Sequence, residues 1–551
     1  MDEYISSELM AEQLSLEGLK VIFTCPTSFG SPVLSALQER HADVRCVVAS
    51  DEHTACNMAT GYAQGSGMPG VIHLTAAPGL TAAMSSLYNA YQTRVPLIAL
   101  IDQQDSQILN DDPPLSGQLS EMARSVSKWS CELRTGGEIA RIIRRAFHEA
   151  LSPPRGPTLL LLPANILPRL SAGQVITPPQ LAPVGSAEAN FIKKAAKVLV
   201  NAENPCVIAG NEISQYRARK EAVSLVEVLG CPAYGEPIPT GVNFPNRHPQ
   251  YSGLLPLNLP QVNRCLAPHD VCLILGMQTR LPARAHEPPM IGSSATVIQI
   301  NVESHLTGRS SPCHLAAHAD MAESLSRLRT EIQLVADPAW VANSKKRAAE
   351  TIGRVTERKQ KDEESLILPK SDAPISLVLL LKSLDKWRPE KSSIVSDLAC
   401  EDINVYDLLT LQTSAAYIAS NSGVGGYALA ASLGVQLASP EQTTICLTSS
   451  ASIAHAPQGM GSARQLGLPV KILVVNSGDA DTAGYLPFKL HQKQTIVRSS
   501  APATKISSLA SALGVAASNI STMGEIEAAL SELFNKPGPR LVEANIGSLT
   551  N

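Results

Sequence analysis

Short, almost continuously apolar runs alternate with helix-length segments along most of the chain, and this alternation limits the fold more than any other feature. The runs in GLKVIFTCP, GVIHLTAAPG and VKILVVNSG have the length and composition of strands that are buried on both faces. Strands of this kind that are separated by helices form parallel sheets covered by helices. The sequence therefore predicts an α/β protein built from parallel sheets flanked by helices.

The alternation divides into three units, which we expect at residues 1–180, 187–335 and 370–551. A stretch rich in Pro, Gly and Ser at 170–186 predicts the first linker. A highly charged stretch at 344–365 precedes the third unit, and its charges recur on most helical faces. That pattern predicts a solvated connecting helix and not a partner-binding one.

Composition excludes several classes of protein. The net charge is −4 and aromatic residues make up 4%, which argues against nucleic-acid and anionic-membrane partners. The longest apolar runs are shorter than a membrane span requires. The 11 cysteines are scattered without a CxxC pair, and the N-terminus is polar and acidic. We therefore expect reduced thiols and a cytoplasmic protein that acts on a small molecule.

Three segments of the first unit carry a family resemblance. They are CPTSFGSPVL at 25–34, ASDEHTACNMATGYAQ at 49–64 and IHLTAAPGLTAAM at 72–84. In order and spacing they resemble the thiamine-diphosphate-dependent 2-oxo acid decarboxylase and carboligase family, most closely its benzoylformate decarboxylases and more distantly its acetohydroxyacid synthases. The resemblance implies a pyrimidine-binding-type first domain, a structural central domain and a third domain of the Mg-diphosphate-binding type. It also implies an active site between two subunits, and hence a homodimer or homotetramer.

The same resemblance implies roles for residues of the first unit. Glu52 falls on the carboxylate that hydrogen-bonds the cofactor's aminopyrimidine and promotes its imino tautomer, and Ser28 falls on a substrate-contacting serine. Thr75 stands where benzoylformate decarboxylase has a catalytic histidine. His73 lies two residues earlier, so on a strand it would share that face. It either replaces the missing histidine or is packed elsewhere.

The other histidine positions leave similar alternatives. The family's second active-site histidine aligns with Ala283, and the nearby His286 lies in an HEPP turn that predicts an exposed loop. His455, on the helix expected after the third unit's second strand, is a further candidate for the cleft. If the cofactor is absent, His53 is the nearest candidate partner for the neighbouring Glu52.

The resemblance breaks in the third unit. The family's metal-binding motif begins Gly-Asp-Gly after one strand and ends in Asn-Asn after the next, and its Asp and second Asn hold Mg²⁺. Here Ser450 and Ser477 stand at those two positions, still 27 residues apart, and Asp479 stands at the third ligand position.

Two further diphosphate-binding features are altered or weak in the third unit. A Thr/Ser pair that contacts diphosphate in the family aligns with Cys400 and Glu401. The glycine loop at 421–426, with Gly423 and Gly425, remains, although a glycine-rich loop alone is a weak signal.

These substitutions change what the site can bind. Mg²⁺ prefers carboxylate ligands beside phosphates, and serine hydroxyls replace them poorly. Glu401 and Asp479 would each bring negative charge toward the diphosphate, and one such contact costs about 4 kcal/mol at an effective dielectric of about 20. That cost is about three decades of affinity. The sequence therefore predicts that the usual Mg-thiamine diphosphate does not bind. The alternative is a rewired site in which Asp479 holds Mg²⁺ with the help of Glu401.

Three functions follow from these alternatives. The first is an enzyme that keeps the fold and uses the intersubunit cleft for thiamine-diphosphate-independent chemistry on a small carboxylate or carbonyl compound, with Glu52 as the acid or base. The second is a 2-oxo acid decarboxylase or carboligase with a rewired metal site, of the lyase or transferase type. The third is a non-catalytic subunit of an active relative. Acetohydroxyacid synthases carry a flavin, so the resemblance also allows FAD, although no fingerprint here supports it.

Overall fold

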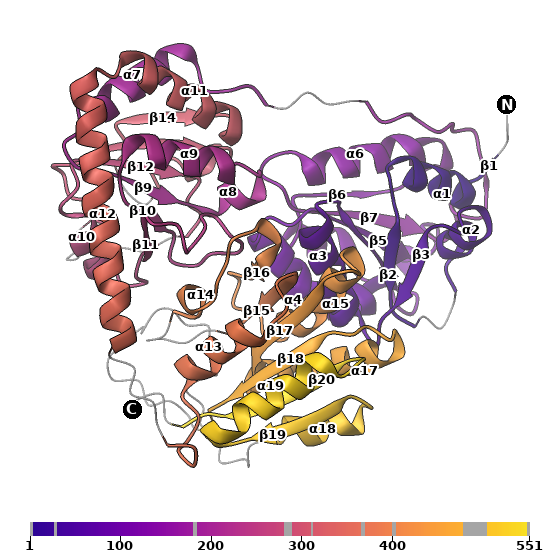
Figure 1. Cartoon of the computed structure of the whole chain (residues 1–551). Helices are drawn as coiled ribbons and strands as arrows, with labels where there is room; N and C mark the ends of the chain where they lie inside the picture. The colour runs from indigo at the N-terminus through magenta and orange to yellow at the C-terminus, as the bar shows by residue number, and fades with distance from the viewer. Residues whose placement is uncertain are drawn as a thin grey trace.

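The computed structural model describes residues 4–26, 30–179, 184–279, 281, 289–309, 312–364, 370–398, 404–477 and 504–547. Within them lie three six-stranded sheets, one in each third of the chain (Figure 1). Neighbouring strands are parallel in all three sheets. Helices flank the sheets, so the predicted α/β class is confirmed.

The first sheet has the strand order β3-β2-β4-β5-β7-β6. Buried side chains of α1, α2 and α6 cover one face, and those of α3, α4 and α5 cover the other. A short antiparallel pair, β1 and β8, ties the start of this unit to its end. The elements are β1 (Tyr4–Ile5), α1 (Ser6–Leu16), β2 (Val21–Thr24), α2 (Pro32–Arg40), β3 (Arg45–Val48), α3 (Glu52–Ser66), β4 (Gly70–Leu74), α4 (Ala76–Gln92), β5 (Leu97–Gln103), α5 (Leu119–Arg124), β6 (Trp129–Glu132), α6 (Ile139–Leu151), β7 (Pro157–Pro163) and β8 (Leu170–Ser171).

The middle sheet has the order β11-β10-β9-β12-β13-β14. The chain therefore starts in the centre, at β9, runs to one edge, and then returns to β12 and runs to the other edge. The elements are α7 (Ala189–Val200), β9 (Pro205–Ala209), α8 (Asn211–Gln215), α9 (Arg219–Leu229), β10 (Ala233–Gly235), β11 (Tyr251–Leu254), α10 (Leu259–Leu266), β12 (Val271–Leu275), β13 (Thr296–Asn301), β14 (Leu315–His318) and α11 (Met321–Val335).

The third sheet has the order β16-β15-β17-β18-β20-β19. Its elements are α13 (Leu377–Trp387), β15 (Ser392–Ser396), α14 (Val405–Leu408), β16 (Tyr417–Ala419), α15 (Tyr427–Ala438), β17 (Thr443–Ser449), α16 (Ser450–His455), α17 (Gln458–Gln465), β18 (Lys471–Asn476), α18 (Ile506–Ala512), β19 (Ala516–Ile520), α19 (Ile526–Asn535) and β20 (Arg540–Asn545).

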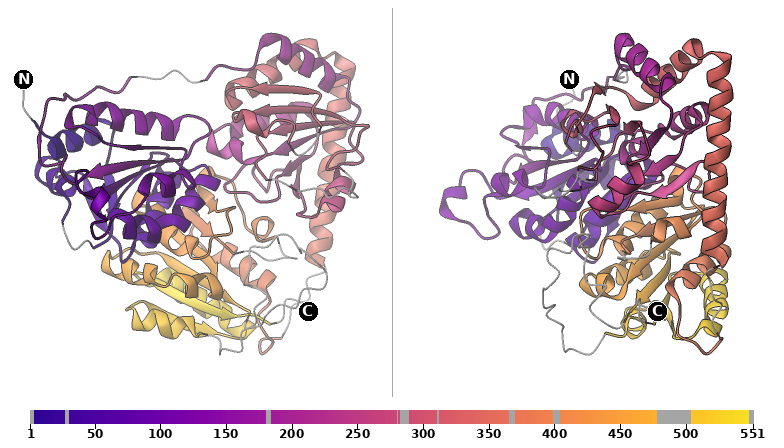
Figure 2. Two further views of the ribbon diagram at one scale, coloured as in Figure 1. Left: turned by 180° about the vertical axis from the view of Figure 1, so that it is seen from behind. Right: turned by 90° about the vertical axis from the view of Figure 1, so that its left-hand side faces the viewer.

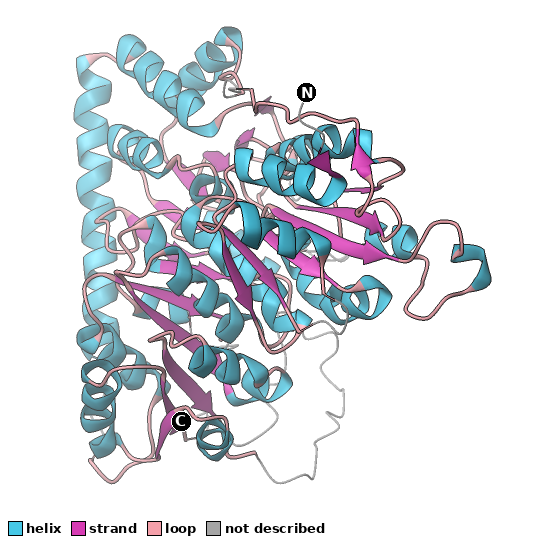
Figure 3. Cartoon of the chain, turned by 90° about the vertical axis from the view of Figure 1, so that its right-hand side faces the viewer, coloured by secondary structure: helices cyan, strands magenta, loops and turns pink. Residues whose placement is uncertain are grey.

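The predicted connecting helix is present as α12 (Pro338–Glu364), which runs along the outside of the middle unit toward the third (Figures 2 and 3). Most of its side chains are exposed, as the charge pattern predicts. Among the described residues, none of the helices is long and apolar enough to cross a membrane.

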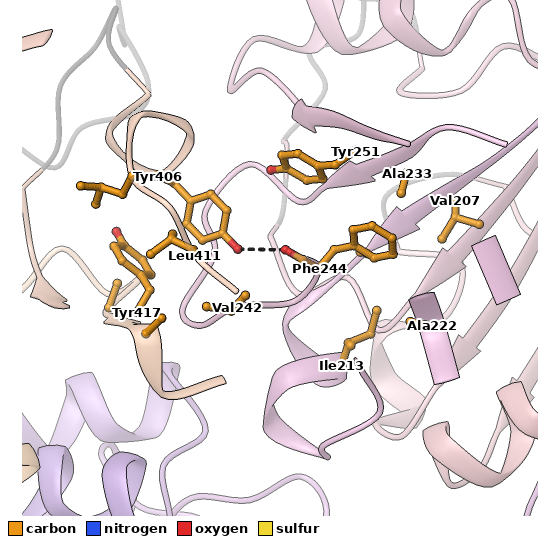
Figure 4. Close-up of a cluster of buried hydrophobic side chains, with 14 of the residues drawn as sticks. Val207, Ile213, Ala222, Ala233, Val242, Phe244, Tyr251, Tyr406, Leu411 and Tyr417 are labelled. Carbon is orange, nitrogen blue, oxygen red and sulfur yellow. Dashed lines mark hydrogen bonds between the residues drawn. The ribbon is translucent and has the colours of Figure 1, made fainter. Parts of the chain in front are cut away.

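Two junctions hold the units together. α3 of the first unit crosses α15 of the third, and one hydrophobic cluster continues from the first sheet through both helices into the third sheet. A second cluster joins the middle and third units (Figure 4). There the rings of Tyr406 and Tyr417 meet edge to face, and the Tyr406 hydroxyl donates to the carbonyl oxygen of Phe244.

Candidate functional site

Glu52 is the first residue of α3, directly after the turn that follows β3. Asp51 caps this helix: its Oδ1 accepts the Thr54 N–H at 2.8 Å and its Oδ2 accepts the Thr54 hydroxyl at 2.8 Å. A carboxylate in the first turn is stabilised by the helix dipole. Cys25 lies just after β2, and burial, together with the nearby carboxylate of Glu52, raises the pKa of its thiol to about 12. The thiol therefore stays protonated at neutral pH.

His53 faces the third unit. Its Nδ1 lies 2.9 Å from the Ser86 hydroxyl, and its Nε2 lies 3.1 Å from the Asn57 amide nitrogen. Its ring meets that of His455 edge to face, with the centroids 6.4 Å apart. Burial lowers the pKa of His53, and the neighbouring His455 lowers it further against the opposing effect of Asp51. The imidazole is therefore neutral at pH 7 and can accept a proton.

His73 and Thr75 occupy different environments. His73 is fully buried in β4, where its Nε2 lies 3.0 Å from Oδ1 of Asp102 and its Nδ1 lies 3.5 Å from the Thr24 hydroxyl. β4 ends at Leu74, one residue before Thr75. Thr75 is already the N-cap of α4, and its hydroxyl is buried without a hydrogen-bond partner among the described atoms.

The residues predicted to replace the family's metal motif lie at the carboxyl ends of the third sheet, after β17 and β18. Ser449 caps the short helix α16 by accepting the Ser452 N–H at 3.2 Å. The Ser450 hydroxyl donates to Asn476 at 3.3 Å, and the Asn476 amide donates to Glu543 at 2.8 Å. Glu543 is fully buried and also accepts the first backbone N–H groups of α18. The Glu543 carboxylate, on the neighbouring strand β20, therefore already has its hydrogen-bond partners within the chain.

Asp397, just after β15, is the second buried carboxylate at this edge. It accepts the hydroxyls of Thr448 and Ser452, each at 2.6 Å, and the Ala428 N–H at 3.0 Å. Burial raises the pKa of Asp397 although these hydrogen bonds act in the opposite direction. The Ser452 hydroxyl in turn accepts the N–H of Gly426 at 2.8 Å. The chain's own side chains therefore fix the last residue of the glycine loop.

The glycine loop also contacts the first unit. The Ser422 hydroxyl donates to Asn89 of α4 at 2.8 Å. Gly423 has a φ of +76°, a conformation that favours glycine. A Cβ at Gly425 would lie 3.6 Å from the His455 ring, and one at Gly426 would lie 3.2 Å from Nε2 of His53. The loop thus lies between the two histidines and the start of α15.

The described residues contain no group of three or more His, Cys, Asp or Glu side chains placed to hold a metal. Ser450 and Ser477, which were predicted to stand at the family's metal-ligand positions, carry hydroxyls. Several candidate residues of the sequence analysis lie outside the described part of the chain: Ser28, Ala283, His286, Cys400, Glu401 and Asp479.

Comparison with known proteins identifies the fold and the lineage. Residues 6–124 match the thiamine pyrophosphate enzyme N-terminal TPP binding domain, residues 192–328 the central domain and residues 399–544 the C-terminal TPP binding domain. The chain belongs to the thiamine pyrophosphate enzyme family. The family resemblance inferred from the sequence is therefore confirmed.

Individual members of the thiamine pyrophosphate enzyme family resemble the chain over almost its whole length. It is 23% identical over 535 residues to benzoylformate decarboxylase of Pseudomonas aeruginosa, covering 97% of each. It is 25% identical over 488 residues to the acetolactate synthase large subunit of Buchnera aphidicola, covering 87% of this chain and 83% of that one. The solved thiamine diphosphate-dependent 4-hydroxybenzoylformate decarboxylase of Rhodococcus jostii superposes with a TM-score of 0.83 at 23% identity, over 99% of both chains.

The sequence of this thiamine pyrophosphate enzyme did not reveal one residue of the site, Asp397, or one contact, between His53 and His455. Asp397 follows an apolar run and shows only that a strand has ended. The contact of His53 with His455 joins residues about four hundred positions apart, and only the packing of α3 on α15 brings them together. A polar residue that directly follows a buried strand is the one signal that pointed toward Asp397.

Proposed function

We propose that this chain is an enzyme that uses the thiamine pyrophosphate enzyme fold for chemistry without the usual Mg-thiamine diphosphate. It acts on a small carboxylate or carbonyl substrate in a cleft that a second copy of the chain completes. The relatives named above are a decarboxylase and a synthase, which supports enzymatic activity of the lyase or transferase type. Its free cysteines suit the cytoplasm.

One observation supports the proposed loss of the usual cofactor. At the carboxyl edge of the third sheet, the two buried carboxylates Asp397 and Glu543 bind hydroxyls, an amide and backbone N–H groups of the chain itself. Ser450, at the position of the family's metal-binding Asp, donates to Asn476. A diphosphate here would meet negative charge without a carboxylate-held cation, which costs about 4 kcal/mol for one contact at moderate dielectric.

Glu52 is the acid or base in this proposal. It begins a capped helix, is half-buried and lies near the protonated thiol of Cys25. A carboxylate held in this way can take a proton from a carbon or oxygen acid and return it to the product. The neutral His53 follows Glu52 in the sequence and can exchange a proton with a substrate in the same cleft.

Calorimetric titration of the purified chain with thiamine diphosphate and Mg²⁺ tests the proposal. We expect no saturable heat, and we expect turnover of at least one member of a panel of 2-oxo acids, aldehydes and other small carboxylates without added cofactor. Glu52→Gln should abolish that turnover while leaving the unfolding midpoint nearly unchanged. Micromolar binding of the cofactor would overturn the proposal in favour of a rewired decarboxylase or carboligase. Lack of turnover combined with co-purification of an intact relative would favour a non-catalytic subunit.

A further inference from the structure

The carboxyl edge of the middle sheet has the topology of a ligand site. β9 and β12 are neighbours in the sheet, but the chain leaves them in opposite directions. In open parallel sheets the loops then diverge, and nucleotides bind in the resulting crevice, with their phosphates on backbone N–H groups. The FAD that acetohydroxyacid synthases carry makes such a crevice relevant to this chain.

Glu236 occupies the N–H groups on one side of this point. It follows β10 and is fully buried. Its Oε1 accepts the N–H of Asn211 at 2.6 Å, and its Oε2 accepts the N–H groups of Gln278 and Thr279, each at 2.8 Å. Asn211 begins α8, directly after β9, and Gln278 and Thr279 lie in the loop after β12. A carboxylate with three N–H donors fills the place that a phosphate oxygen would take.

Glu212 occupies the N–H groups on the other side. It is also fully buried, and its two oxygens accept the N–H groups of Val302 and Glu303, at 2.7 and 2.9 Å, just after β13. The backbones are closely packed here as well. A Cβ at Gly210 would overlap the carbonyl of Gly276, and a Cβ at Gly276 would overlap the Glu212 side chain.

The same edge binds the first unit. Glu303 is buried, and its Oε2 lies 3.1 Å from Nε of Arg94, just after α4. Gln215 donates to the carbonyl of Thr93 at 3.4 Å, and Arg155 donates to the carbonyl of Gln215 at 3.1 Å. Removing one partner of a buried ion pair strongly destabilises a protein, because the other charge is left buried and unpaired. The carboxyl edge of the middle sheet therefore forms a contact between the middle unit and the first unit.

We propose that the carboxyl edge of the middle sheet is an interdomain joint and not a nucleotide site. Glu212 and Glu236 saturate the N–H groups that the phosphates of ADP or FAD would need, and Glu303 binds Arg94 across the joint. A nucleotide could enter only by displacing a fully buried carboxylate from its donors, which leaves that carboxylate unsatisfied. The inference does not depend on the fate of thiamine diphosphate in the third unit.

The test combines titration with hydrogen exchange on the full chain. ADP and FAD are titrated separately by calorimetry up to about 1 mM, and backbone amide exchange is followed by mass spectrometry with and without each nucleotide. We expect no saturable binding and slow exchange at Asn211, Gln278 and Thr279. Glu236→Ala should speed exchange at these amides by at least about tenfold. Asp320→Ala, which removes the side-chain cap of α11, is the matched control and should change only the start of that helix.

Each other outcome decides the question. Saturable ADP or FAD binding that protects residues 206–212 and 272–279 overturns the proposal, and so does fast exchange of those amides in the unmodified chain. Binding that protects only residues 421–452 leaves the joint closed, and it would instead count against the function proposed above. If Glu236→Ala does not fold, the titration and the exchange of the unmodified chain still decide.

Discussion

Gly434 of α15 lies directly against the carbonyl oxygen of Met58 of α3, so close that a Cβ at position 434 would overlap that oxygen. Gly61 of α3 makes the reciprocal contact with the backbone of Ala431. Two glycines thus let the helices of the first and third units cross at backbone distance. The crossing places His53 beside His455 and the glycine loop.

Gly434→Ala should disrupt this crossing. Backbone atoms must move to admit the methyl group, so we expect the free energy of unfolding to fall by about 3 kcal/mol or more. Gly353→Ala is the control, because this glycine is exposed in α12 and a Cβ there would meet nothing within 4 Å. The control should gain about 1 kcal/mol at most from helix propensity. Urea unfolding measures both, and equal effects would contradict the role of the crossing.

Ser450→Asp combined with Ser477→Asn should restore part of the family's metal site. Ser450 begins α16 and Ser477 follows β18, so the two strand ends still lie on neighbouring strands. The new carboxylate and amide are ligands that Mg²⁺ prefers. We expect the double variant to bind Mg-thiamine diphosphate at least about tenfold more tightly than the unmodified chain in calorimetry.

Ser511→Asp is a suitable control for charge alone, because Ser511 is exposed in α18 and its hydroxyl donates to the carbonyl of Ser507. It should leave the affinity for the cofactor unchanged. If the unmodified chain and the double variant bind equally well, the losses at Ser450 and Ser477 are not what limits binding.

The sequence predicted the fold well because its signal is local. Apolar runs marked strands, and helical segments such as ALAASLGVQLA are present as expected, here within α15. The charge pattern likewise predicted α12. Strands of parallel sheets are buried on both faces, so their continuous apolar runs are easily recognised in a sequence.

The site was less predictable because it depends on contacts between distant segments. His73 is bound to Asp102 of β5, whereas Thr75, two residues later, is the N-cap of α4. The hydroxyl partners of Asp397 come from β17 and α16, about fifty residues away. Such pairings follow from strand register and helix packing, which a single sequence does not reveal.

His53 should titrate below its ordinary range. Burial and the neighbouring His455 lower its pKa, so its folded-state pKa lies below the unfolded value of 6.5. The stability that the neutral ring contributes is present above pH 6.5 and is lost as the pH falls through the folded pKa. NMR of histidine-labelled protein, with His53→Gln for assignment, measures this pKa. His455→Asn should raise it, and a titration at 6.5 or above in the unmodified chain would contradict the geometry.

The buried carboxylates of the middle unit should make its stability fall at alkaline pH. Burial raises the pKa of Glu212 to about 8 and that of Glu236 to about 7, although backbone hydrogen bonds oppose the shift. Both folded values exceed the unfolded value of 4.5, so the stabilisation is complete below pH 4.5 and is lost as the pH rises through 7 to 8. We expect urea unfolding to give a lower free energy of unfolding at pH 8.5 than at pH 6, by at least about 1 kcal/mol.

Glu236→Gln, which cannot ionise, should reduce this difference, whereas Glu323→Gln, exposed on α11, should leave it unchanged. A free energy that rises between pH 6 and 8.5 would mean that the N–H donors, and not burial, dominate at both carboxylates.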